Sequence, residues 1–200
     1  MKTKHFLLLS FISFAIVVAS CKKDTSADNG NNQYVGTYDF VSMDASTVTS
    51  ESYSDGGTNY YDIAYAGWHS KNNSGTVTID SKNFTSSNLA YSIDTTINAY
   101  FYEDNVLQDS LEEPFAFDVP PSSGSSSYKL VTSDSIYFTG GSVLFNGATT
   151  SSAPSGAKLK WSGNILYLSA SMSKDSTDNS TGFPVSIHEE ATISVGLKKH

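Results

Sequence analysis

The run KLKWSGNILYLSA, from Lys158 to Ala170, constrains the fold of this chain more than any other stretch. Its centre, Gly163-Asn164, fits a two-residue type II′ turn with glycine at the first central position. This turn predicts an antiparallel hairpin with the pairs Ser162–Ile165, Trp161–Leu166 and Leu159–Leu168. Side-chain alternation then puts Lys158 and Lys160 on one face, and on the other Leu159, Trp161, Leu166, Leu168, Ala170 and Met172.

Alternating runs between turn residues recur along the rest of the chain, as is typical of strands joined by hairpins. Apolar residues keep one phase from Leu89 to Phe101, and again from Val185 to Leu197, where Glu189 occupies an apolar position. This carboxylate predicts either a β-bulge at a barrel rim or a polar group inside a barrel. A second hairpin is expected at Gly140-Gly141, with Ile136, Phe138, Val143 and Phe145 on one face.

The remaining segments complete an all-β prediction. Shorter strands are expected near 35–43, 60–68, 75–79, 113–119 and 128–131, and loops at 120–127, 146–156 and 173–184. Ser, Thr, Asn, Gly and Tyr are abundant, and no useful length of helical periodicity follows residue 21. We therefore expect an antiparallel up-and-down β-barrel of about eight to ten strands, with a β-sandwich as the alternative.

The first 21 residues have the pattern of an export signal. Lys2 and Lys4 precede an apolar run of 14 residues, Phe6–Ala19, which is too short to span a bilayer. Val18-Ala19-Ser20-Cys21 then resembles the lipobox of bacterial lipoproteins, and the following lysines resemble those of the Bacteroidetes type. The resemblance implies cleavage between Ser20 and Cys21, and acyl chains such as palmitate on Cys21.

The expected organisation follows from this signal. Residues 1–20 are the signal peptide, 21–33 are the lipidated cysteine with a polar tether, and 34–200 are one domain. We expect the protein in the cell envelope, anchored to the outer membrane by its lipid. The chain has a formal net charge of −8 and no arginine, which makes nucleic acid a poor partner. Its one cysteine leaves no disulfide partner.

The domain resembles a lipocalin-like protein of the calycin type. Gly36-Thr37-Tyr38 stands where lipocalins open their first strand with Gly-x-Trp. The segment 75–93 resembles the hairpin that follows, and 191–195 resembles the closing strand. The resemblance implies a cup that holds a small apolar ligand without catalysis. The candidate ligand-binding residues are Tyr38, Tyr91, Trp161 and Glu189.

Other functions have weaker support in the sequence. His188-Glu189 lacks the second histidine and the helix of a zinc-protease motif, and no serine-hydrolase elbow is present, so we expect no enzyme, cofactor or metal. Haem or metal ligation by His69 and His188 is one alternative. Another is glycan binding or adhesion through the aromatic cluster Tyr60, Tyr61, Tyr65 and Trp68. A structural envelope protein without a ligand is the third.

Overall fold

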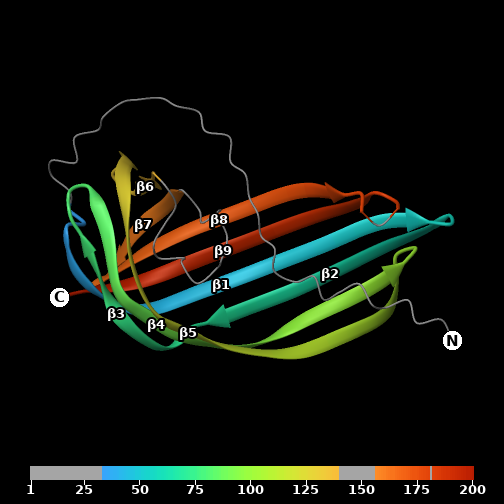
Figure 1. Cartoon of the computed structure of the whole chain (residues 1–200), viewed down its shortest axis with the longest axis horizontal. Coiled ribbons are helices and arrows are strands. Elements are labelled where there is room, and N and C mark those ends of the chain that lie inside the picture. The colour runs from blue at the N-terminus through green and yellow to red at the C-terminus, as the bar shows by residue number, and fades with distance from the viewer. Residues whose placement is uncertain (1–32, 140–155, 181) are drawn as a thin grey trace.

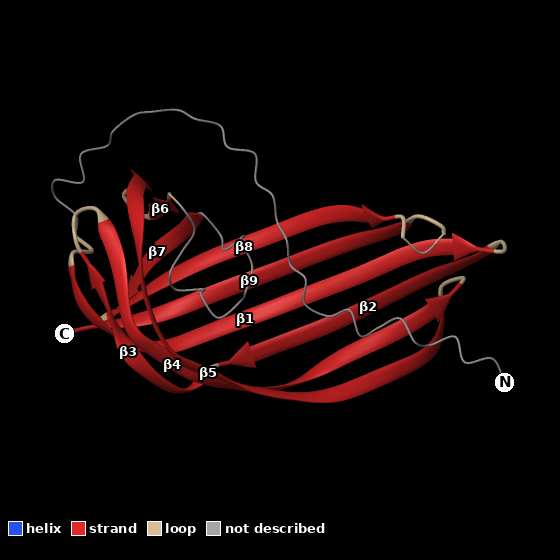
Figure 2. Ribbon diagram, in the orientation of Figure 1, coloured by secondary structure: helices blue, strands red, loops and turns tan. Residues whose placement is uncertain are grey.

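The computed structural model describes residues 33–139, 156–180 and 182–200. These residues form one antiparallel sheet without helices, which confirms the all-β, up-and-down prediction (Figure 2). None of the described residues forms a helix that could cross a membrane. The strands are β1 (Gly36–Asp55), β2 (Thr58–His69), β3 (Lys71–Ile79), β4 (Asn83–Glu103), β5 (Val106–Thr132), β6 (Ser135–Phe138), β7 (Gly156–Ser162), β8 (Ile165–Asp178) and β9 (Val185–Lys199).

The sheet closes into a ring in one half of the molecule. There β1 pairs with β3, each later strand from β3 to β9 pairs with the next, and β9 pairs back with β1 (Figure 1). The interior of this ring is filled by large side chains with almost no solvent exposure. They include Tyr38, Phe84, Phe138, Leu168 and Leu197. The ring is therefore a packed barrel core, to which most of the buried apolar residues belong.

The other half is an open extension of the same sheet. The long strands β1, β4, β5, β8 and β9 continue beyond the ring, and β2 replaces β3 between β1 and β4. The resulting order is β8-β9-β1-β2-β4-β5. Among the described strands, the pairing of β6 with β5 is limited to residues 128–132 of β5, and the pairing of β7 with β8 is limited to residues 165–169 of β8. The outer parts of β5 and β8 are therefore the two edges of the open half.

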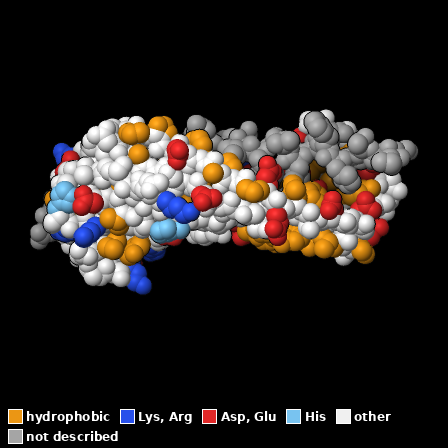
Figure 3. All heavy atoms as spheres, turned by 90° about the horizontal axis from the view of Figure 1, so that it is seen from below, with side chains coloured by type: hydrophobic (Ala, Val, Ile, Leu, Met, Phe, Trp, Pro, Cys, Tyr) orange, Lys and Arg blue, Asp and Glu red, His pale blue; other side chains and the backbone are white. Residues whose placement is uncertain are grey.

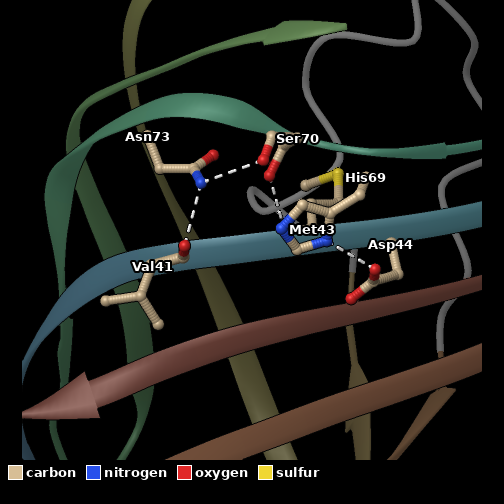
Figure 4. Close-up of polar contacts among 6 residues, drawn as sticks. All are labelled: Val41, Met43, Asp44, His69, Ser70 and Asn73. Carbon is tan, nitrogen blue, oxygen red and sulfur yellow. Dashed lines mark hydrogen bonds and ion pairs between the residues drawn. The ribbon is translucent and has the colours of Figure 1, made fainter. Parts of the chain in front are cut away.

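A network of hydrogen bonds stabilises the junction between the two halves, where β2 ends and β3 begins (Figure 4). The Met43 amide donates to the Ser70 hydroxyl at 2.7 Å, and the Ser70 amide donates to the Met43 carbonyl at 2.8 Å. The Asn73 side chain donates to the Val41 carbonyl at 2.8 Å and to the Ser70 carbonyl at 3.3 Å. These bonds replace ladder bonds where the register of β3 shifts.

The predicted hairpin at Gly163-Asn164 is confirmed. Leu159 lies opposite Leu168, Trp161 opposite Leu166, and Ser162 opposite Ile165. Gly163 has a φ of 59°, as the turn requires. The long runs 89–101 and 185–197 are also strands in the predicted phase. The hairpin at Gly140-Gly141 lies outside the described residues, as do the signal, Cys21, most of the tether and most of the 146–156 loop. Ile136 lies opposite Ala157 of β7.

One predicted loop is wrong, and a second, 173–184, is wrong in its first half and correct for its described residues after 178. Residues 120–127 belong to β5, and residues 173–178 belong to β8. In the first, hydroxyl and amide side chains bond across to β4, as in the Thr85–Ser125 pair at 3.1 Å and the Ser127–Asn83 pair at 2.9 Å. Pro120 and Pro121 are tolerated because the β4–β5 register shifts beside them. In the second, polar side chains conceal a strand whose ladder with β9 is continuous.

Candidate functional site

Two of the predicted ligand residues, Tyr38 and Trp161, pack at the closed end of the barrel. Tyr38 is fully buried, and its hydroxyl donates to the Tyr34 carbonyl at 2.5 Å. The Trp161 ring lies 6.2 Å from the Tyr38 ring and 6.4 Å from the Tyr34 ring, with the Lys199 ammonium 5.8 Å from the indole. Burial raises the pKa of Tyr38 to about 12, so its phenol stays neutral.

Tyr91, the third predicted residue, lies where the barrel passes into the open half. Its ring packs against Phe40 at 5.8 Å and stacks on Trp68 at 6.1 Å. Burial raises the pKa of Tyr91. Tyr38 is thus a member of the buried core cluster, and Tyr91 and Trp161 are partly buried and pack against it.

Glu189, the fourth, belongs to a different part of the molecule. It lies on the face of the open half that continues the barrel interior, which we call the inner face. The β8–β9 ladder is regular on both sides of Glu189, so the predicted bulge is wrong. Its side chain is 16% exposed, and the Lys174 ammonium lies 3.9 Å from its carboxylate. The structure thus separates Glu189 from the three aromatic residues predicted with it.

Glu189 belongs to an acidic group on the inner face. Glu51 lies opposite Asp62 on the neighbouring strand, and Asp178 is close enough to act on Glu51. Burial raises the pKa of Glu51, and the charges of Asp62, Asp178 and Glu189 raise it further. Lys174 is the cation that pairs with Glu189 on this surface. The electrostatic potential of this region is therefore negative.

Apolar side chains surround the acidic group on the inner face. They lie on the same face of their strands as the residues of the barrel core. On β5, however, Leu111 and Phe117 are exposed. Charge also differs between the two halves of the molecule: on the side drawn in Figure 3, lysines lie over the barrel half, and hydrophobic and acidic side chains lie together over the open half. The main apolar residues of the inner face are Met172, Ile187, Ile193, Ile97, Phe101, Leu111, Phe115 and Phe117.

The predicted aromatic cluster is divided between the two faces of the sheet. Tyr60 and Trp68 are on the inner face, where Tyr60 stacks on Tyr53 at 4.8 Å. Tyr61 and Tyr65 are on the opposite face, which we call the outer face. There Tyr61 lies 5.9 Å from the ring of Tyr102, and Tyr65 lies 6.2 Å from the ring of Tyr100. The register of β4 against β2 brings Tyr100 and Tyr102 next to Tyr61 and Tyr65. The spacing of residues in the sequence did not predict that these two β4 tyrosines join the cluster.

The two histidines proposed as ligands are each paired with carboxylates. His69 Nδ1 lies 2.7 Å from Asp44. His188 Nδ1 lies 2.7 Å from Asp175, and its Nε2 lies 3.1 Å from Glu190. Two hydrogen bonds raise the pKa of His188, and the bond to Asp175 contributes more than the bond to Glu190. No three His, Cys, Asp or Glu side chains in the described ranges are arranged to hold a metal ion.

Comparison with known proteins gives no relative from which a role could be transferred. No family model, curated protein or solved structure matches the chain. The function must therefore be argued from the two faces of the open half.

Proposed function

We propose that the protein is a lipid-anchored component of the cell envelope that binds a small amphiphile, without catalysis, on the inner face of its open half. The observation that carries the proposal is the apolar character of a face that the sheet leaves uncovered along β5. Phe117, which continues the phase of the barrel core, is 48% exposed, and Leu111 is similarly exposed. Exposed apolar surface of this kind marks ligand or partner sites in soluble domains.

The acidic group selects the head group of such a ligand. Glu51 and Glu189 are half-buried near Asp62 and Asp178, and Lys174 is the cation paired with Glu189, so an added anion would meet more negative than positive charge in a region of low dielectric constant. A cationic head group would relieve the repulsion that raises the pKa of Glu51. The apolar side chains supply binding energy at about 25 cal/mol per Å² of surface removed from water. We therefore expect a cationic amphiphile to bind more tightly than an anionic one.

A displacement assay tests this function. The unlipidated chain 21–200 with Cys21→Ser is mixed with N-phenyl-1-naphthylamine, an apolar fluorescent probe, and titrated with dodecylamine or dodecanoate. We expect the fluorescence of the probe to rise when it binds the protein. Dodecylamine should displace the probe at a lower concentration than dodecanoate does. Phe117→Ser should weaken probe binding, whereas Val131→Ser, at a 65% exposed apolar position on the barrel part of β5, should not. Absence of probe binding, or equal loss in both variants, would refute the proposal.

The anchor requires its own test, since it concerns residues before the described domain. In bacteria that express the full chain, we expect the protein in the detergent-soluble fraction of the outer membrane. Cys21→Ser removes the sulfur that would carry the lipid. The variant should then keep its apolar signal, which can itself hold the chain in a membrane, so the readout is the outer-membrane fraction alone. Presence of Cys21→Ser in the outer membrane at the level of the unaltered protein would contradict the lipid anchor.

A further inference from the structure

The outer face of the open half carries a band of side chains without any formal charge. The band spans β1, β2 and β4, where three rows of paired residues lie side by side. Its members are Val48, Tyr65 and Asn98; Ser50, Ile63 and Tyr100; and Ser52, Tyr61 and Tyr102. We call these nine residues the tyrosine band. Its lack of charge is notable in a chain with 20 acidic and 12 basic residues.

A hollow of about 550 Å³ adjoins the tyrosine band at the tip of the open half. This volume lies within the range of small-molecule sites, about 300–1,000 Å³. None of the residues that line the hollow is charged. The lining residues are Ser52, Tyr53, Ser54, Asn59, Tyr60, Tyr61, Asn105, Pro184 and Ser186. A second hollow of about 390 Å³ shares Ser52 and Ser186 with it and extends to His188.

The polar groups of the larger hollow are held in place. Asn59 accepts a hydrogen bond from the Ser54 hydroxyl at 2.8 Å. Its side-chain amide donates to the Asp104 carboxylate at 3.1 Å, and its backbone amide donates to the same oxygen at 3.0 Å. Fixed orientation lowers the entropy that a polar ligand must overcome on binding. The hollow thus offers hydroxyl and amide groups in set positions beside the ring of Tyr61.

We propose that the larger hollow and the tyrosine band together bind a neutral glycan. Sugars present apolar C–H faces, which stack on tyrosine rings, and hydroxyls, which bond to serine and asparagine side chains. Tyr61 and Tyr65 are four residues apart on β2, about 13 Å at ~3.3 Å per residue, which suits an oligosaccharide rather than one sugar. A lining without charge offers nothing to a polyanion. The tyrosine band lies on the face opposite the proposed amphiphile site, whereas the hollow at the tip also takes Tyr53 and Tyr60 from the inner face. The glycan proposal does not depend on amphiphile binding.

Affinity electrophoresis tests the proposal. The chain 21–200 with Cys21→Ser is run in native gels that contain soluble starch, dextran, laminarin or galactomannan, with alginate as the anionic comparison. We expect at least one neutral polysaccharide to retard the protein and alginate to leave its mobility unchanged. Retardation by none of the four neutral polysaccharides, or by alginate alone, would overturn the proposal.

Matched variants locate the binding surface. Tyr61→Ala should weaken binding about tenfold or more, because it removes the ring shared by the hollow and the band. Tyr137→Ala removes a tyrosine of comparable exposure on β6, 44% against 39% for Tyr61, and should leave binding unchanged. Ser52→Gln fills the hollow from an exposed position and should abolish binding without unfolding the domain. Equal losses in Tyr61→Ala and Tyr137→Ala, or full binding by Ser52→Gln, would overturn the assignment.

Discussion

Gly75 is the position where replacement by alanine should reveal how closely β3 approaches β4. Its φ is +97°, and an added Cβ would lie 2.5 Å from the Asn88 carbonyl oxygen and 2.7 Å from the Leu89 nitrogen. Both atoms belong to the backbone, so the contact cannot be relieved by a side-chain rotation. The strained φ costs an L-residue about 1–2 kcal/mol, and forcing β3 and β4 apart adds about 1–3 kcal/mol. Gly75→Ala should therefore lower the free energy of unfolding by about 2–5 kcal/mol.

Gly57→Ala separates these two contributions. Gly57 has a similar φ of +88°, but no atom lies within 4 Å of an added Cβ. Its replacement should cost only the backbone strain, about 1–2 kcal/mol. Urea unfolding followed by tryptophan fluorescence gives both values, and unchanged m-values would show that the same surface is exposed on unfolding. If the two variants are equally destabilised, β3 and β4 do not approach each other at Gly75 as described.

Three further predictions concern the core and the titrating groups. Leu168→Ala, at a fully buried barrel position, should lower the unfolding free energy by about 2–5 kcal/mol in the same urea assay, and a cost near zero would contradict a packed barrel. Because the pKa of Glu51 is raised on folding from 4.5, its ionisation destabilises the folded state as pH rises above the unfolded-state pKa. Glu51→Gln should therefore raise the melting temperature more at about pH 7 than at about pH 4, unlike exposed Glu112→Gln, and the reverse order would show the wrong sign. Asp175→Asn should lower the pKa of His188, which NMR titration of the imidazole measures; an unchanged midpoint would mean that the Asp175 hydrogen bond is absent in solution.

Local signals in the sequence predicted the Gly163-Asn164 hairpin and the phase of the long strands well. The Gly163-Asn164 turn determines its register through backbone geometry alone, and the apolar alternation of 89–101 remains visible because the residues of one face are all buried or partly buried. The strand at 120–127 could not be predicted in this way. Its Ser-rich sequence has no apolar alternation, and its place in the sheet depends on side-chain bonds to β4.

The candidate sites depended on pairings between distant strands, which explains why they were predicted only in part. Tyr61 and Tyr65 were identified from their spacing, but Tyr100 and Tyr102 join them only through the β2–β4 ladder. In the same way, alternation placed Glu189 among apolar residues, whereas Glu51 and Asp62 reach it from other strands. The opening of the sheet also escaped prediction, because nothing in the sequence of β5 shows that β6 covers only its far end.

The pairing of the first strand with the last also determines when the protein can fold. β1 has its longest described ladder with β9, from Tyr38 opposite Lys199 to Ser52 opposite Ser186. During synthesis, β1 therefore lacks this partner until the C-terminal residues have been made. Contacts between such distant residues must overcome a large loop-closure entropy, which makes folding slow. The barrel therefore cannot close before β9 has been made.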